Sequence, residues 1–210
     1  MIRVAIDINH VIRNIYGQIL KYYNKDIDPS LDIEEIDTKE DIFKYLNFVT
    51  EDNKREFIYT DYPYEIFGCA KAVEKDLPAE INKWLYDITN FEKDAIDIFY
   101  FGLSEDSLTI QSSYFFLSKI GTRVRKVIFP TKDEEVITQA DVIISTDGKL
   151  LSEAEGKYRI LIKTKFNEEY HGKFENEFDS LSEVIKNKEL LDVWYDKVHN
   201  TENIDAYGQE

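Results

Sequence analysis

Polar side chains lie at or just beyond the carboxyl end of each of the first four apolar runs of this sequence. In chain order they are Asp7 and Asn9, then Ser104, then Thr131 and Lys132, and finally Ser145, Thr146 and Asp147. In an open α/β sheet, ligands bind at the carboxyl ends of the strands, so we expect these side chains to converge. A carboxylate, a hydroxyl and a lysine are together suited to phosphoryl transfer. The carboxylate attacks phosphorus while the other two groups hold the phosphoryl oxygens.

Each of these residues also has a plainer interpretation. An acidic residue after a strand often caps a turn, Ser104 can simply begin the next helix, and a lone lysine such as Lys132 is usually solvated. His10 is open to two interpretations, because it can substitute for a missing acid or pack against the segment that follows it. Only the shared order and placement of these residues favours a functional site.

The apolar runs predict the strands of a parallel sheet. They are short, nearly continuous and rich in Ile, Val and Phe, which is typical of strands that are buried on both faces. The runs span residues 3–8, 96–103, 126–129, 141–144 and, as a fifth, 158–162. Helical segments at 108–120, ended by Gly121, and at 132–139 alternate with them. The sequence therefore predicts an α/β fold with a Rossmann-like, doubly wound parallel sheet.

Residues 12–91 break this alternation and predict a helical insertion. Amphipathic segments lie at 15–23, 39–48 and 78–89, the last opened by Pro78. About 80 residues is too long for an ordinary crossover between two strands. We therefore divide the chain into an α/β core, residues 1–11 and 92–210, and an insertion, residues 12–91. A final helix is expected at 181–198, with Ser180 as its N-cap.

The aromatic residues of the insertion allow two interpretations. They are Tyr59, Tyr62, Tyr64 and Phe67. Such rings can stack on a nucleobase, or they can form the core of a small helical unit.

The composition excludes several classes of partner. The 42 acidic and 26 basic residues give a net charge of −16, which argues against binding nucleic acid or an anionic membrane, since both need a basic face. A single cysteine, Cys69, and three histidines leave no cysteine-based zinc site and disfavour a multi-histidine metal site. The amino-terminal segment contains Asp7 and is predicted to be a strand, not a signal peptide. No apolar run approaches the roughly 18 residues of a membrane helix, so we expect a cytoplasmic protein.

The order of the polar residues resembles the haloacid dehalogenase (HAD) superfamily, and within it the deoxyribonucleotidase-like branch. The Asp-x-Asp motif of that family corresponds to Asp7-Ile8-Asn9, its Ser or Thr to Ser104, and its Lys to Lys132. The fourth motif, approximately "aDvlIDD", corresponds to residues 140–146, and the family's "ILFD.P.N" stretch corresponds to Ile160-Leu161-Ile162-Lys163 and Asn167. The family also carries its cap after the first motif, where this chain has its insertion.

The resemblance implies roles for these residues. Asp7 would be the nucleophile that forms an aspartyl-phosphate, and residue 9 would protonate the leaving oxygen and then activate water. Ser104 and Lys132 would hold the phosphoryl group, and Asp7 together with the fourth-motif acids would bind Mg²⁺. The implied substrate is a small phosphorylated molecule such as a nucleoside monophosphate.

Two motifs depart from the family pattern. Asn9 has no proton to give or accept near pH 7, and general acid–base catalysis is worth roughly 10²- to 10⁴-fold. Ser145 and Thr146 stand at the two acidic positions of the fourth motif, which leaves Asp147 one residue beyond them as the metal ligand with Asp7. One residue of extended chain moves a carboxylate by about 3.3 Å and changes its direction.

These departures leave two hypotheses. The first is a nucleotidase-like HAD protein with impaired or absent catalysis, which keeps a pocket for phosphate or a nucleotide, or serves as a scaffold for a protein partner. The alternative is an active Mg²⁺-dependent phosphohydrolase that works through an aspartyl-phosphate on Asp7. Losses at Asn9 and at Ser145 and Thr146 affect two independent parts of one mechanism, which favours the first hypothesis.

Overall fold

The computed structural model describes residues 1–91, 96–103, 106–190 and 192–194, and it contains a six-stranded parallel sheet. The strand order is β5-β4-β1-β6-β7-β8. The strands are β1 (Ile2–Asp7), β4 (Ile96–Phe101), β5 (Lys126–Ile128), β6 (Val142–Ser145), β7 (Tyr158–Ile162) and β8 (Asn176–Phe178). The predicted α/β, Rossmann-like fold is confirmed, and all five predicted strands are present. The short edge strand β8 was not predicted, because three residues carry too little pattern.

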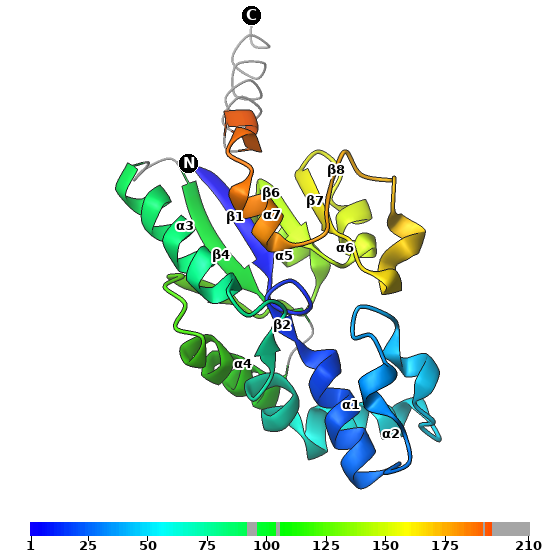
Figure 1. Cartoon of the computed structure of the whole chain (residues 1–210). Helices are drawn as coiled ribbons and strands as arrows, with labels where there is room; N and C mark the ends of the chain where they lie inside the picture. The colour runs from blue at the N-terminus through cyan, green and yellow to red at the C-terminus, as the bar shows by residue number, and fades with distance from the viewer. Residues whose placement is uncertain (92–95, 104–105, 191, 195–210) are drawn as a thin grey trace, which may run out of the picture.

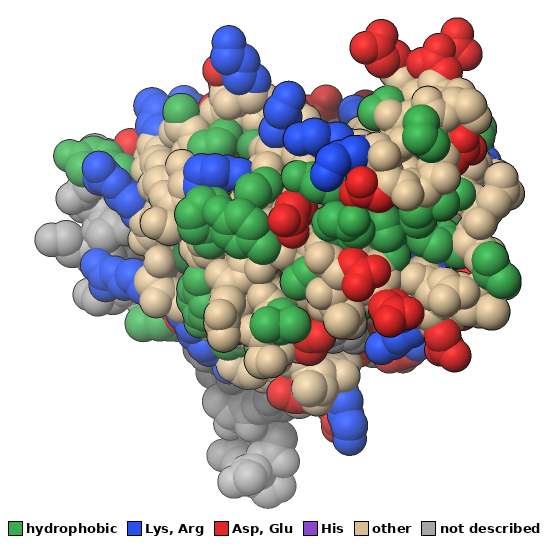
Figure 2. Space-filling view, turned by 90° about the horizontal axis from the view of Figure 1, so that it is seen from below, with side chains coloured by type: hydrophobic (Ala, Val, Ile, Leu, Met, Phe, Trp, Pro, Cys, Tyr) green, Lys and Arg blue, Asp and Glu red, His purple; other side chains and the backbone are tan. Residues whose placement is uncertain are grey.

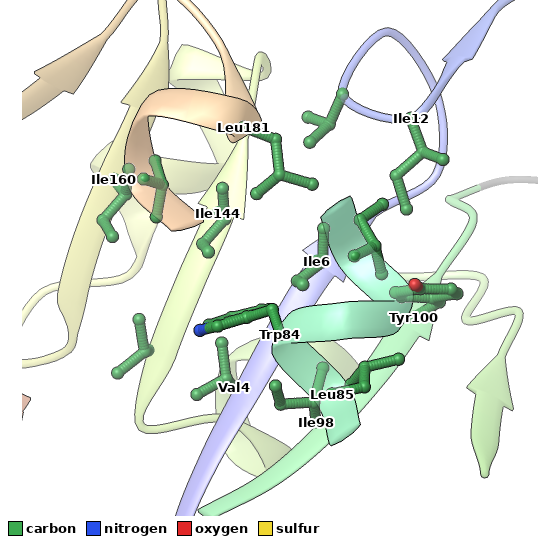
Figure 3. Packing of buried hydrophobic residues seen from close by; sticks show 14 of the residues in the cluster. Val4, Ile6, Ile12, Trp84, Leu85, Ile98, Tyr100, Ile144, Ile160 and Leu181 are labelled. Carbon is green, nitrogen blue, oxygen red and sulfur yellow. The ribbon is translucent and has the colours of Figure 1, made fainter. Parts of the chain in front are cut away.

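Helices cover both faces of the sheet. On one face, α3 (Leu77–Phe91), α4 (Ser107–Lys119) and α7 (Leu181–Lys186) join a cluster with alternate residues of the strands, such as Val4 and Ile6. Figure 3 shows Trp84 and Leu85 of α3 in this cluster. On the other face, α5 (Asp133–Gln139) and α6 (Gly148–Glu153) pack on the intervening strand residues. Burial of both faces explains why the strands are continuous apolar runs.

The chain changes direction across the sheet at β1. It runs outward from β1 through β4 to β5, then returns to β6 on the other side of β1 and continues outward to β8. The crevice beyond the carboxyl ends of β1 and β6 is therefore the topological switch point, where ligands bind in open α/β sheets. Asp7 ends β1 and Ser145 ends β6.

The insertion lies beyond the carboxyl ends of β1 and β4, as Figure 1 shows, and has a core of its own. It contains α1 (Ile15–Asp26), η1 (Ile33–Glu35), η2 (Ile42–Tyr45), α2 (Glu51–Glu56), η3 (Phe57–Asp61) and η4 (Tyr64–Gly68). Phe67 is buried in its core, and Tyr59 and Tyr62 pack against that core. These three rings therefore hold the insertion together, as the second interpretation of the aromatic residues expected.

Tyr64 lies outside this core and joins the insertion to α4. Its ring packs on Phe115 at 5.0 Å between centroids, and both side chains remain partly exposed. Figure 2, the view from below, shows apolar side chains on this face of the molecule interspersed with charged ones. A two-stranded antiparallel ribbon, β2 (Arg13–Asn14) with β3 (Lys71–Ala72), forms part of the connection between the insertion and the sheet.

Three predicted helical segments differ in detail from the structure. Within the predicted insertion of residues 12–91, α3 packs on the sheet, since Ile81, Trp84 and Leu85 belong to the sheet's cluster. The segment at 39–48 forms only the single 3₁₀ turn η2. The final helix, expected at 181–198, begins after its N-cap Ser180 as predicted, but α7 ends at Lys186 because Asn187 has an extended backbone. The described residues 189–190 and 192–194 are helical again. Amphipathic spacing alone does not specify which core a helix joins or where it breaks. No helix in the described part of the chain is long and apolar enough to cross a membrane.

Candidate functional site

A cavity of about 410 Å³ lies at the switch point of the sheet. Its walls come from the end of β1, from the turn after β6 and from the segment after β7. The residues that line it are Asp7, Asn9, His10, Ile15, Leu103, Thr146, Asp147, Gly148, Phe166, Asn167, Glu169 and Tyr170. The predicted residues Asp7, Asn9 and Asp147 therefore meet in one cavity, as the carboxyl ends of parallel strands require.

The Asp7 carboxylate is buried and accepts two hydrogen bonds. Its Oδ1 accepts from the backbone N–H of Asn9 at 2.9 Å, and its Oδ2 accepts from the Ser145 hydroxyl at 2.7 Å. The Ser145 oxygen in turn accepts from the backbone N–H of Asp147 at 2.9 Å. One serine thus joins the end of β1 to the turn that begins α6. Ser145 is also one of the two residues at which the resemblance to the HAD motif leads one to expect an acid.

Burial raises the pKa of Asp7 to about 7. The loss of solvation is the largest cause, and the nearby charge of Asp147 adds to it. The hydrogen bonds from Ser145 and the Asn9 backbone, and the charge of Arg13, act in the opposite direction but do not offset burial. This carboxyl group therefore keeps its proton to a much higher pH than an ordinary aspartate does.

The Asn9 side chain is bound by a buried arginine. Its Oδ1 accepts from Nε of Arg13 at 3.1 Å and from Nη2 at 2.6 Å. A tight turn brings the two residues together: the backbone N–H of Arg13 donates to the carbonyl of Ile8 at 2.8 Å, and that of His10 donates to the carbonyl of Arg13 at 2.8 Å. An amide held in this way has neither the proton nor the freedom of a general acid.

His10 packs against aromatic rings. Its backbone lies in the left-handed region, with φ of 62°, and its ring lies 4.2 Å from Tyr16 and 5.0 Å from Phe166 between centroids. Burial, with the charge of Arg13, lowers the pKa of His10 to about 3. The imidazole is therefore neutral at physiological pH and has no imidazolium proton to donate, which favours the packing interpretation of this residue.

Asp147 caps the helix that follows β6. Its Oδ1 accepts from the backbone N–H groups of Lys149 at 2.9 Å and Leu150 at 3.1 Å. This arrangement satisfies two donors that a helix start leaves without partners. The side chain faces the cavity, but one of its oxygens is committed to the helix. The described residues contain no group of three or more His, Cys, Asp or Glu side chains placed to hold a metal ion.

Lys132, one of the two predicted phosphate ligands, is not among the described residues that line the cavity. Lys132 is exposed at the N-cap position of α5, after β5, where its carbonyl accepts a backbone hydrogen bond from Glu135. Ser104 lies outside the described residues.

Asn167 fixes the far wall of the cavity. It is 3% exposed, and its Nδ2 donates to the carbonyls of Thr146 at 2.8 Å and Ile162 at 3.0 Å. Its Oδ1 accepts from the backbone N–H of Thr164 at 2.9 Å. The same oxygen lies 2.9 Å from Nε2 of His171, so that nitrogen must carry the proton. Asn167 thereby ties the turn after β6 to the segment after β7.

Arg13 and Tyr170 are site residues that the sequence did not reveal. Arg13 follows Asn9 by four residues within an apolar stretch, and an unexpected arginine there is the only signal. Tyr170 lies 22 residues beyond Gly148, and its ring packs directly on the α-carbon side of that glycine. No sequence spacing marks such a contact.

We predict that Gly148→Ala displaces Tyr170 and reshapes the cavity. A methyl group at this position would overlap the Tyr170 ring, so the ring must move. We expect a loss of roughly 1–3 kcal/mol in the free energy of unfolding, measured with urea. Gly17→Ala in α1 is the control, because its methyl group would meet the Asn14 side chain only at 3.6 Å, an ordinary contact. A Gly148→Ala protein as stable as wild type would contradict this packing.

Two comparisons bear on the family of this chain. No protein-family model matches it, and no curated protein matches it. The resemblance to the HAD superfamily therefore rests on the short motifs, whereas the α/β fold and the geometry of the cavity rest on the structure.

Proposed function

We propose that this chain is a cytoplasmic, nucleotidase-like HAD protein that binds a small phosphorylated molecule and has lost efficient hydrolysis. The observation that carries the proposal is the hydrogen bond of 2.7 Å from the Ser145 hydroxyl to Asp7. It puts a neutral donor beside the predicted nucleophile, at the position where the family has a metal-binding acid. In this proposal the protein binds its ligand in the cavity but does not hydrolyse it efficiently.

Neither Asn9 nor His10, the two residues that lie close to the predicted nucleophile at the first motif, replaces the acid–base half of the family mechanism. The Asn9 amide is bound to Arg13, and His10 is neutral near pH 7. Tyr16, which packs on His10, has its pKa raised by burial, so it is not a ready acid either. The missing step alone accounts for a loss of roughly 10²- to 10⁴-fold in rate.

The residues at the cavity do not fit the family's Mg²⁺ site. Both oxygens of Asp7 accept hydrogen bonds, one from the Asn9 backbone and one from the neutral Ser145 hydroxyl. Asp147 uses one oxygen to cap α6. Mg²⁺ requires near-ideal octahedral geometry, usually with ionised carboxylates, and a serine hydroxyl in place of an acid removes a charged ligand. We therefore propose that ligand binding at this site does not depend on Mg²⁺.

The cavity retains features that suit a phosphorylated ligand. Its volume of about 410 Å³ lies within the range of small-molecule sites. Phe166 and Tyr170 line it as apolar surface. Protonation of Asp7 near neutral pH also reduces the repulsion that an anion would meet there. The net charge of −16 continues to argue against nucleic acid and membranes as partners.

Phosphatase assays of repaired variants test this proposal. We expect wild type to release no phosphate from p-nitrophenyl phosphate or nucleoside monophosphates with Mg²⁺ present. Asn9→Asp alone and Ser145→Asp alone should also be inert, because each repairs one of two independent losses. The double variant should gain Mg²⁺-dependent activity that a further Asp7→Asn change abolishes. Wild-type turnover that depends on Mg²⁺ and is lost in Asp7→Asn would instead establish the active phosphohydrolase.

A further inference from the structure

The Asn9 amide has one chemically sensible orientation. Two N–H groups of Arg13 donate to it, so the atom facing the guanidinium must be the carbonyl oxygen Oδ1. If the amide were flipped, the N–H groups of Nδ2 would face the N–H groups of Arg13, and neither could accept a hydrogen bond. The two N–H groups of Nδ2 therefore lie on the opposite side of the amide carbon. Among the described residues, none accepts a hydrogen bond from Nδ2, and Asn9 lines the cavity.

Arg13 is itself held from several sides. It is fully buried, Nη1 donates to the carbonyl of Phe67 at 3.2 Å and to the Ser113 hydroxyl, and the guanidinium carbon lies 5.0 Å from the Phe67 ring centroid. The Phe116 ring lies 5.5 Å from the same carbon. These contacts come from η4 of the insertion and from α4 of the core. An arginine remains protonated and cannot accept a hydrogen bond, so the Asn9 atom that faces Arg13 is always the oxygen Oδ1.

We propose that Asn9 is a hydrogen-bond donor to an oxygen of a bound oxyanion, and that Arg13 is the positioning residue that turns the amide for this task. The position that resembles the family's general acid would thus serve in ligand recognition. This inference rests on the proposed function, because it assigns the contact through which a phosphoryl group is recognised.

The charged groups near the Asn9 amide make a hydrogen bond from Asn9 to a bound anion valuable. Asp147 and Glu169 line the cavity and oppose an anion, so an anion needs donors close to it. The Arg13 guanidinium directly behind Asn9 polarises the amide and strengthens its N–H groups as donors.

Titration with inorganic phosphate in the presence of EDTA tests the inference. We expect Asn9→Ala to weaken phosphate binding by about 10- to 100-fold, the loss of one hydrogen bond to a charged acceptor. In ¹⁵N–¹H spectra of wild type, phosphate should shift both side-chain N–H peaks of Asn9. Arg13→Met should weaken binding by about 5- to 10-fold and move these two peaks toward the positions of a freely rotating asparagine side chain, while Arg13→Lys should partly restore both.

Controls separate positioning from folding. Asn82→Ala removes an amide whose hydrogen bonds, to Gly121 and Arg123, are exposed and lie outside the cavity, so it should leave phosphate affinity within about twofold of wild type. Should Arg13→Met fail to fold, Asn9→Ala and the wild-type spectra still decide the matter. If Asn9→Ala binds phosphate as tightly as wild type does, the donor role of Asn9 is wrong, but the proposed function still stands. Wild type that binds neither phosphate nor a nucleoside monophosphate would overturn the proposed function and this inference together.

Discussion

Asp7→Asn is expected to stabilise this protein at neutral and alkaline pH and to have little effect on stability near pH 4. The reason is the raised pKa of Asp7, about 7 in the folded protein compared with 3.8 for an unperturbed aspartate. Between these values the folded state binds a proton that the unfolded state has released. The contribution of Asp7 to wild-type stability therefore falls as the pH rises through this window, and the penalty is complete above pH 7.

The size of this effect follows from the shift. A difference of about three pKa units corresponds to about 4 kcal/mol, so the advantage of Asp7→Asn over wild type should grow by about 4 kcal/mol from pH 4 to pH 8. The asparagine carries no charge to desolvate, whereas any cost of its altered hydrogen bond to Ser145 is the same at every pH. Urea unfolding of both proteins across this range, in EDTA, measures the difference.

Glu168→Gln is the matched control, because it neutralises an exposed carboxylate close to the cavity wall. Its effect on the free energy of unfolding should not change with pH by more than about 0.5 kcal/mol. A constant difference between Asp7→Asn and wild type from pH 4 to pH 8 would show that Asp7 ionises normally. The raised pKa of Asp7, which supports anion binding without a metal ion, would then be wrong.

Asn167→Asp is expected to be among the most destabilising single-atom changes in the molecule. It removes the two N–H donors that hold the carbonyls of Thr146 and Ile162 and replaces them with an oxygen facing both. Buried carbonyls without donors cost about 1–3 kcal/mol each, and the new carboxyl group must remain protonated or be buried with its charge. We expect a loss of about 3–5 kcal/mol, measured by urea unfolding at pH 7.

Asn82→Asp is the control, because it makes the same substitution at an exposed asparagine. Asn82 also donates through Nδ2 to a backbone carbonyl, that of Gly121 at 2.9 Å, and accepts through Oδ1 from the backbone N–H of Arg123. Both bonds are exposed, so water replaces what the substitution removes, and the loss should stay below about 1 kcal/mol. Equal losses at positions 82 and 167 would mean that burial of the Asn167 network contributes nothing.

The sequence predicted the parts of the site that depend on strand ends. Asp7, Asn9 and Asp147 follow apolar runs, and parallel strands bring their carboxyl ends to one edge, so these residues meet at the cavity. The sequence did not reveal Arg13 or Tyr170, because each enters the site through a contact with a residue that no periodic pattern marks.

Helix membership was less predictable than strand position. An amphipathic segment such as α3 has an apolar face that fits either the insertion or the sheet, and only the packing of Trp84 and Leu85 decides for the sheet. The segment at 39–48 has helical spacing, but the structure there is limited to the turn Ile42–Tyr45. Tertiary contacts override weak local propensity in such short segments.

The sequence by itself determined the α/β fold, since only strands buried on both faces produce runs of Ile, Val and Phe with a helix between them. It also determined that Asn9 and Ser145 replace acids that the resemblance leads one to expect. Only the tertiary structure decided what these replacements do. Ser145 donates to Asp7 across 138 residues of chain, and Arg13 turns the Asn9 amide. Burial raises the pKa of Asp7 because desolvation depends on every neighbour that excludes water, and sequence neighbours are few among them.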